Sequence, residues 1–162
     1  MNQKETLEFR FAKEEDTALV MQFIQELAEY EKLSDQVTVT EESLRKELFE
    51  KKAAEVLFAV EDGKEIGFAL FFHNFSTFLG KSGLYLEDLF IRPENRGKGI
   101  GTEIFKRLAK IAKERGYGRM EWSCLNWNKP SIQFYGSMGA KAMDEWTVHR
   151  LTEDGIAKLA EA

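Results

Sequence analysis

The sequence has little of three residue types that often define small proteins: one cysteine, two histidines and two prolines among 162 residues. The lone Cys124 excludes an internal disulfide framework, and with two histidines it leaves too few soft ligands for a structural zinc site. We therefore expect no metal and a cytoplasmic location, where thiols stay reduced. Because proline is scarce and no linker or internal repeat is present, we expect a single domain over residues 1–162.

Long apolar runs and an excess of positive charge are also missing. The longest apolar stretch, Ile66 to Phe72, is too short to span a bilayer, and Met1 to Arg10 do not resemble a signal peptide. Lysine and arginine total 23 against 28 aspartate and glutamate residues, which gives a net charge of -5. A general nucleic-acid binder would carry a basic surface. We therefore expect a small cationic partner, with no nucleic acid and no membrane.

The apolar periodicity predicts a mixture of strands and helices. Strands are expected at 7–11, 56–60, 66–72, 84–91, 120–125 and 148–151, and helices at 17–33, from 40, at 102–115, from 130 and from 152. The pair Asp62-Gly63 predicts a tight hairpin turn. The helix between the strands at 84–91 and 120–125 is long enough for a right-handed parallel crossover. The prediction is a mixed α/β sheet, antiparallel in its N-terminal part, with a parallel βαβ unit and covering helices.

A glycine-rich segment joins the strand that ends at Ile91 to the helix at Thr102. Gly97, Gly99 and Gly101 let the backbone approach a ligand, and successive N–H groups at a helix N-terminus form an anion cradle suited to a pyrophosphate. The spacing matches neither the P-loop of nucleotide hydrolases nor the dinucleotide-binding fingerprint. From these residues alone, a glycine-rich turn without a ligand is the alternative.

Two motifs together resemble the GNAT superfamily of N-acetyltransferases. Arg96-x-x-Gly99-x-Gly101 is similar to that superfamily's acetyl-CoA pyrophosphate loop, and the block 127–135, closing at Gly139-Ala140, resembles its downstream motif. Segments 26–31, 84–88 and the Trp-Asn-x-Pro-Ser-Ile block are especially similar to the diamine, or spermidine/spermine, acetyltransferases. The similarity covers nearly the whole chain.

This resemblance implies a GNAT-like sheet of about seven strands with helices on both faces, splayed so that pantetheine inserts like an extra strand. It also implies acetyl-CoA as the donor and a homodimer. The backbone of residues 89–91 would pair with pantetheine, and segment 96–102 would hold the pyrophosphate. The residues expected to contact the cofactor are Leu89, Phe90, Ile91, Arg96, Gly97, Lys98, Gly99, Ile100, Gly101, Thr102, Asn128, Ser131 and Tyr135.

Acetyl transfer to an amine requires a neutral nitrogen and a proton for the departing thiolate. Because an alkyl ammonium has a pKa of roughly 10.4, its deprotonation at pH 7 costs about 4.6 kcal/mol, which makes a positioned base valuable. Glu87 is the candidate base, acting through water by resemblance, and Tyr135 is the candidate acid for the leaving sulfur. The alternatives are a strand carboxylate in a structural hydrogen-bond network and a core tyrosine.

The resemblance also indicates where the acceptor would bind. The residues expected to contact it are Tyr30, Glu31, Glu87, Asp88, Trp122 and Glu145. Successive side chains of a regular strand leave opposite faces, so Glu87 and Asp88 can share a role only if a bulge lies there. An exposed acidic helix end is the alternative for Tyr30 and Glu31, and a core or rim aromatic is the alternative for Trp122.

The predicted function is acetyl transfer from acetyl-CoA to a primary amine of a polyamine, diamine or lysine-like small molecule by direct attack on the thioester. Phe78 stands where relatives have a tryptophan, which leaves the identity of the acceptor open. Two alternatives are an acetyl-CoA-binding regulatory module without turnover and a protein or peptide N-acetyltransferase.

Overall fold

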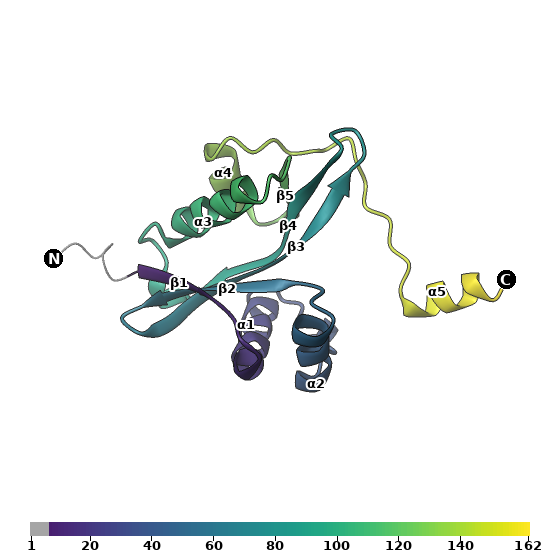
Figure 1. Cartoon of the computed structure of the whole chain (residues 1–162), viewed down its shortest axis with the longest axis horizontal. Coiled ribbons are helices and arrows are strands. Elements are labelled where there is room, and N and C mark those ends of the chain that lie inside the picture. The colour runs from purple at the N-terminus through teal and green to yellow at the C-terminus, as the bar shows by residue number, and fades with distance from the viewer. Residues whose placement is uncertain (1–6) are drawn as a thin grey trace. The chain divides into compact units, whose positions relative to one another are not determined.

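The computed structural model describes residues 7–162, which divide into two compact units at Ser123 (Figure 1). The strands are β1 (Leu7–Phe11), β2 (Glu55–Glu61), β3 (Lys64–Ser76), β4 (Lys81–Ile91) and β5 (Met120–Trp122). The helices are α1 (Thr17–Tyr30), α2 (Glu41–Arg45), α3 (Ile100–Glu114), α4 (Lys129–Ser137) and α5 (Glu153–Ala160). No helix in this part of the chain is long and apolar enough to cross a membrane.

The first unit is built on one mixed sheet with the order β1-β2-β3-β4-β5. The first three pairings are antiparallel and β4 pairs with β5 in parallel, as the sequence predicts. At the β2–β3 turn, Asp62 and Gly63 both have positive φ, 52° and 77°. A two-residue hairpin turn of this hand requires that conformation, which Asp-Gly adopts readily.

The sheet has five strands in the described residues, so the expectation of about seven is wrong there. The segment Val148 to Leu151 is extended without belonging to a strand, and β5 ends at Trp122 instead of Leu125. A strand requires a neighbouring strand to satisfy its N–H and C=O groups, and apolar alternation does not provide one. The side chains of Val148 and Leu151 are 79% and 57% exposed, so they are not part of a core.

Helices cover both faces of the sheet in the first unit, with α1 and α2 on one side and α3 on the other (Figure 1). Val20, Phe23 and Leu27 recur at helical spacing on α1 and are buried. The Phe23 ring stacks on Phe68 of β3, with 5.3 Å between the ring centroids. This apolar contact fixes α1 against the middle of the sheet, so the C-terminal end of α1 has a defined position beside β4.

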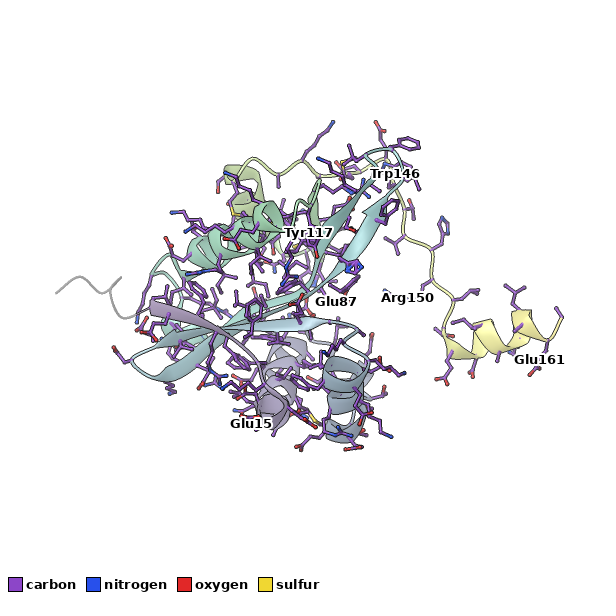
Figure 2. The ribbon with its side chains drawn as sticks, viewed as in Figure 1. Glu15, Glu87, Tyr117, Trp146, Arg150 and Glu161 are labelled. Carbon is purple, nitrogen blue, oxygen red and sulfur yellow. The ribbon has the colours of Figure 1, made fainter. Side chains whose placement is uncertain are left out.

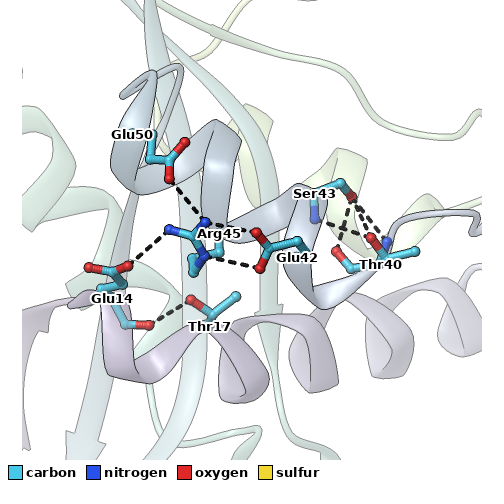
Figure 3. A network of polar contacts seen from close by, with 7 residues as sticks. All are labelled: Glu14, Thr17, Thr40, Glu42, Ser43, Arg45 and Glu50. Atoms are coloured by element: carbon cyan, nitrogen blue, oxygen red, sulfur yellow. Dashed lines mark hydrogen bonds and ion pairs between the residues drawn. The ribbon is translucent and has the colours of Figure 1, made fainter.

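An arginine joins α2 to the segment that precedes α1 (Figure 3). The guanidinium of Arg45 donates to Glu42 at 2.8 and 3.1 Å, to Glu50 at 3.0 Å and to Glu14 at 3.0 Å. The start of α2 is capped by Thr40, whose Oγ1 accepts a hydrogen bond from the backbone N–H of Ser43 at 3.1 Å. These contacts hold the two helices together at their polar edge.

Candidate active site

A bulge in β4 lies at the residue that we predict to be the base. Leu70 of β3 is opposite Asp88, but Phe71 is opposite Leu86, so Glu87 is the extra residue in β4 (Figure 2). A bulge interrupts the alternation that would otherwise send the Glu87 and Asp88 side chains to opposite faces. The structure thus meets the condition under which the two carboxylates can serve one site.

Beyond this bulge, β4 offers an open edge. The pairing of β4 with β5 covers only Leu84 to Leu86 in the described chain, whereas β4 continues to Ile91. The N–H of Arg92 donates to the carbonyl oxygen of Ile66 in β3 at 2.9 Å. The direction of the N–H and C=O groups alternates from residue to residue in an antiparallel pair. Phe90, two residues before Arg92, therefore directs its N–H and C=O groups toward β3, whereas Leu89 and Ile91 direct theirs away from it. An extended ligand chain could pair with Leu89 and Ile91.

The carboxylate of Asp88, between this bulge and the end of α1, lies within the electrostatic influence of Glu87 and Glu31. Burial, together with the charges of Glu87 and Glu31, raises the pKa of Asp88 to about 7. Burial also raises the pKa of Glu31, which follows directly after α1. Asp88 and Glu31 are partly buried and Glu87 is exposed, so a cation that reaches Asp88 would be attracted by a carboxylate that water hydrates poorly. Tyr30, 39% exposed, borders the same place.

Arg96, the first residue of the glycine-rich motif, is held beside this cluster. Its Nε donates to the carbonyl oxygen of Ile91 at 2.8 Å. Its guanidinium carbon lies 4.7 Å from the ring centroid of Tyr30 and 5.2 Å from that of Phe90. Cation–π contacts of this length are attractive. The motif therefore connects the open edge of β4 to the tyrosine that we expect at the acceptor.

The glycine-rich loop has the backbone conformation of an anion cradle. Gly97 and Gly99 have φ values of 81° and 78°, in the left-handed region that glycine favours. A side-chain carbon at either position would meet no atom within 4 Å, so the requirement for glycine is conformational. Gly99 caps α3, whose first turn holds Ile100, Gly101 and Thr102. Free N–H groups at such a helix start fit a diphosphate.

Lys98 contributes less to this cradle than its position in the loop suggests. Its Nζ lies 3.4 Å from a carboxylate oxygen of Glu61 at the end of β2.

The ring centroid of Trp122 lies 5.0 Å from that of Phe105 in α3. Because α3 covers the face of the sheet opposite to α1, this packing favours the core role for Trp122.

The remaining predicted residues belong to the second unit. Asn128 is buried and caps α4, since its Oδ1 accepts a hydrogen bond from the N–H of Ser131 at 3.4 Å. Tyr135 lies on α4, where its ring is 5.8 Å from that of Phe134. Glu145 is exposed in a turn. Within the first unit, the structure brings together Tyr30, Glu31, Glu87, Asp88 and Arg96.

Sequence reasoning missed Arg92 and Glu26. Arg92 follows directly after β4 and makes two hydrogen bonds to the carboxylate of Glu26 on α1, at 3.2 and 3.1 Å. No local pattern signals this pair, because 66 residues separate its members. The available hint is that Glu26 lies one helical turn before Tyr30.

Comparisons with known proteins identify the family and the fold. The model of the acetyltransferase (GNAT) family matches residues 20–140. Thialysine N-epsilon-acetyltransferase of Bos taurus is 37% identical over 163 residues, covering 93% of this chain and 95% of its own. L-ornithine N5-acetyltransferase of Arabidopsis thaliana is 44% identical over 93 residues, 57% of this chain and 41% of its own. The solved structure of an integron cassette protein from the mobile metagenome of V.cholerae superimposes with a TM-score of 0.80 at 30% identity, covering 97% and 99% of the two chains.

Proposed function

Because the chain belongs to the GNAT family of acetyltransferases, we propose that it transfers the acetyl group of acetyl-CoA to a primary amine of a diamine or lysine-like small molecule. The observation that supports an acceptor with two ammonium groups is the cluster of Glu31, Glu87 and Asp88. The pKa values of Glu31 and Asp88 are raised. A second ammonium group on the acceptor would relieve the repulsion among these carboxylates. The likeness to a thialysine acetyltransferase over nearly the whole chain supports the same class.

The open edge of β4 and the glycine-rich loop support binding of the donor. Acetyl-CoA supplies a thioester, whose carbonyl carbon is open to attack by an amine. We assign the backbone groups of Leu89 and Ile91 to the pantetheine arm and the N–H groups of segment 97–102 to the diphosphate. The side chain of Asn128 accepts a hydrogen bond from the backbone N–H of Ser131 at the start of α4. We propose that both residues contact the lower part of the cofactor.

The chemistry divides between two side chains. Glu87 takes a proton from the acceptor ammonium, through a water molecule, so that the nitrogen can attack the thioester carbonyl. Glu87 passes this first proton to solvent. As the new C–N bond forms, the nitrogen loses its second proton to Glu87 through the same water, and the C–S bond breaks. Tyr135 gives its phenolic proton to the departing thiolate and regains a proton from solvent. Asp88, Glu31 and Tyr30 hold the other end of the acceptor, and Trp122 and Glu145 are secondary candidates for that role.

The test is an acceptor panel followed by release of free thiol from acetyl-CoA. We expect the highest kcat/KM with thialysine, lysine, ornithine or short diamines, and a lower value with propylamine, which lacks a second ammonium group. A panel in which no amine releases thiol, while acetyl-CoA still binds, would favour the regulatory module. Activity with peptides alone would favour a protein or peptide acetyltransferase.

Variants assign the two proton-transfer roles. Glu87→Gln and Tyr135→Phe should each lower kcat by roughly 100-fold or more, the range of general acid–base catalysis. Glu8, which is exposed, and Tyr117, which is half-buried beside Arg115, provide matched controls, since Glu8→Gln and Tyr117→Phe make the same chemical changes outside the proposed site. Full activity of Tyr135→Phe would remove the assigned acid, and full activity of Glu87→Gln would remove the assigned base.

A further inference from the structure

A basic groove lies in the first unit, at the edge of the sheet away from the proposed donor site. The sheet order places β1 at one edge and β5 at the other, and we assign the donor to β4, beside β5. The groove has a volume of about 330 Å³ and lies between β1 and the outer face of α3. The residues that line it are Phe9, Glu103, Lys106, Arg107, Ala109, Lys110 and Lys113.

Four cations line this groove against a single carboxylate, although the chain as a whole carries a net charge of -5. Lys106 has Glu103 as a partner, with 3.4 Å between Nζ and a carboxylate oxygen. Lys110 and Lys113 are exposed, and no carboxylate within residues 7–162 forms an ion pair with either. Positions 106, 110 and 113 recur at helical spacing, so the three charges share one face of α3. The groove therefore attracts an anionic ligand.

The side of this groove formed by β1 is apolar. The ring centroid of Phe9 lies 5.1 Å from the guanidinium carbon of Arg107, so the Phe9 side chain is on the α3 side of the sheet. Side chains alternate along a strand, which places Phe11 on the same side. Phe11 is 45% exposed. A ligand that fits this surface therefore combines anionic groups with apolar ones.

The backbone of β1 is open on the side away from β2. The N–H of Ala12, just after β1, donates to the carbonyl oxygen of Val56 in β2 at 2.8 Å. Because backbone groups alternate in direction, Arg10 also directs its N–H and C=O groups toward β2, whereas Phe9 and Phe11 direct theirs to the open edge. In the part of the chain that the structure describes, β1 pairs with no other strand. An extended peptide could therefore add to this edge.

The dimensions of the groove favour a short peptide over a nucleic acid. From Lys106 to Lys113 the cations extend over about 10 Å of the helix axis, which is the length of about three residues of an extended chain. A general nucleic-acid binder would carry a larger basic surface on a less acidic chain. In an added strand, every second side chain would face α3, so acidic residues at alternate positions would meet the cations.

We propose that the open edge of β1 and the cations of α3 together bind an extended acidic segment of a partner protein. The segment adds to β1 as a strand, pairs through its backbone with Phe9 and Phe11, and directs acidic side chains toward Lys106, Lys110 and Lys113. Main-chain hydrogen bonds supply affinity in this mode of recognition, and the cations select the acidic sequence. The inference goes beyond the proposed function and does not depend on it, because the groove contains none of the residues assigned to acetyl transfer.

Fluorescence anisotropy with the full-length protein tests the binding. The probe is a fluorescein-labelled peptide of sequence Glu-Thr-Glu-Val-Glu-Thr, and we expect saturable binding with a Kd below about 1 mM at low salt. A peptide with glutamine in place of each glutamate should bind about fivefold more weakly or worse, because it loses the ion pairs. Raising the salt concentration to about 0.5 M should weaken binding of the acidic peptide, since salt screens exposed charges.

Two further measurements test the addition of a strand. The acidic peptide with N-methyl groups on alternate amides keeps its charge but cannot donate the ladder hydrogen bonds, so it should bind about tenfold more weakly. Bound acidic peptide should also slow hydrogen exchange of the Phe9 and Phe11 amides, as measured by NMR. The Arg10 amide, which already faces β2, is the internal reference and should change little.

The double variant Lys110→Gln, Lys113→Gln removes two cations of the groove. It should raise the Kd of the acidic peptide about fivefold or more, while acetyl transfer stays within about twofold of the wild type. The matched control is Lys46→Gln, Lys52→Gln, which makes the same change in charge at exposed positions in and just after α2, across the sheet from α3 (Figure 1). The control should leave the affinity for the peptide unchanged.

The outcomes separate the parts of this inference. Equal affinity for the acidic and neutral peptides, or an unchanged Kd in the double variant of Lys110 and Lys113, would overturn the role of the cations. Full binding of the N-methylated peptide, with no protection of Phe9 and Phe11, would overturn the added strand. Tighter binding of a single-stranded DNA 12-mer, or protection of these two amides in the protein without peptide, would contradict an acidic peptide as the occupant. Loss of acetyl transfer in every variant and in the wild type would contradict the proposed function alone.

Discussion

Asp88 is a residue whose surroundings disfavour its charge. Burial and the neighbouring charges of Glu87 and Glu31 raise its pKa to about 7, so it is partly protonated near neutral pH. A cationic acceptor would favour the ionised form and lower this pKa again. Ionisation of Asp88 in the folded protein therefore lowers the stability of the fold when no cation lies beside it.

The free energy of unfolding should therefore depend on pH over the range in which Asp88 ionises. The folded pKa of about 7 lies above the ordinary value of 3.8, so the folded state holds the proton more tightly than the unfolded state. The stabilisation is complete below pH 3.8 and is lost as the pH rises to about 7. The shift corresponds to at most about 4 kcal/mol.

Asp88→Asn mimics the protonated form at every pH. We expect this variant to exceed the wild type in free energy of unfolding by about 2 to 4 kcal/mol at pH 8, with the difference vanishing near pH 4. Urea titrations at pH 4, 6 and 8 measure it. The same variant should bind a diamine more weakly at pH 8.

Asp35→Asn, at an exposed position outside the cluster, is the control and should change stability little at any of these pH values. An Asp88→Asn protein that is less stable than the wild type at pH 8 would show that the carboxylate is stabilised in the fold. That result would contradict the argument from burial and like charge.

Among the elements, the loop that starts α3 combines a conformational requirement with the binding role that we propose for it. Gly99 and Gly80 both have positive φ, 78° and 64°, and a side-chain carbon at either would meet no atom within 4 Å. Gly80 lies in the turn between β3 and β4, away from the loop. Alanine would therefore introduce the same kind of backbone strain at both positions, but only Gly99 belongs to the loop that we propose to bind the diphosphate.

Gly99→Ala and Gly80→Ala should each lower the free energy of unfolding by about 1 to 2 kcal/mol, because an L-residue is strained in the left-handed region. Only Gly99→Ala should also weaken binding of coenzyme A, by about tenfold, since it tilts the N–H groups at the start of α3. Chemical denaturation and calorimetric titration measure the two effects. Equal coenzyme affinity in both variants would refute the cradle.

At the scale of the molecule, the second unit carries large apolar side chains that its own fold does not cover. Ile156 and Leu159 of α5 are 58% and 67% exposed, and Trp146 and Val148 before it are 76% and 79% exposed. Exposed apolar faces of this kind mark contact surfaces. We propose that a second copy of the chain covers α5, which agrees with the homodimer implied by the family resemblance.

Sedimentation equilibrium should give twice the 18.7 kDa chain mass. The double variant Ile156→Gln, Leu159→Gln should shift the protein toward the monomer, because it removes apolar area from the contact. Lys158→Gln, on the same helix, is the control and should leave the dimer intact. A wild-type monomer at micromolar concentration would contradict this prediction.

Local sequence determined the features that depend on neighbours along the chain. The Asp62-Gly63 turn, the glycine-rich start of α3 and the apolar stripe of α1 followed from backbone preference and helical spacing. The family motifs then identified the acetyltransferase chemistry, because residues that bind a shared ligand recur at fixed spacing.

Tertiary structure decided what depends on pairing across the chain. Glu87 became the bulge residue only through the register of β4 against β3, and Arg92 met Glu26 only because β4 ends beside α1. The predicted strand at Val148 to Leu151 did not form, since apolar alternation provides no neighbouring strand. Turns and helix caps are fixed by contacts between residues a few positions apart. Strand registers and ion pairs between distant residues form only when the chain folds, and pKa values are raised where the folded chain excludes water.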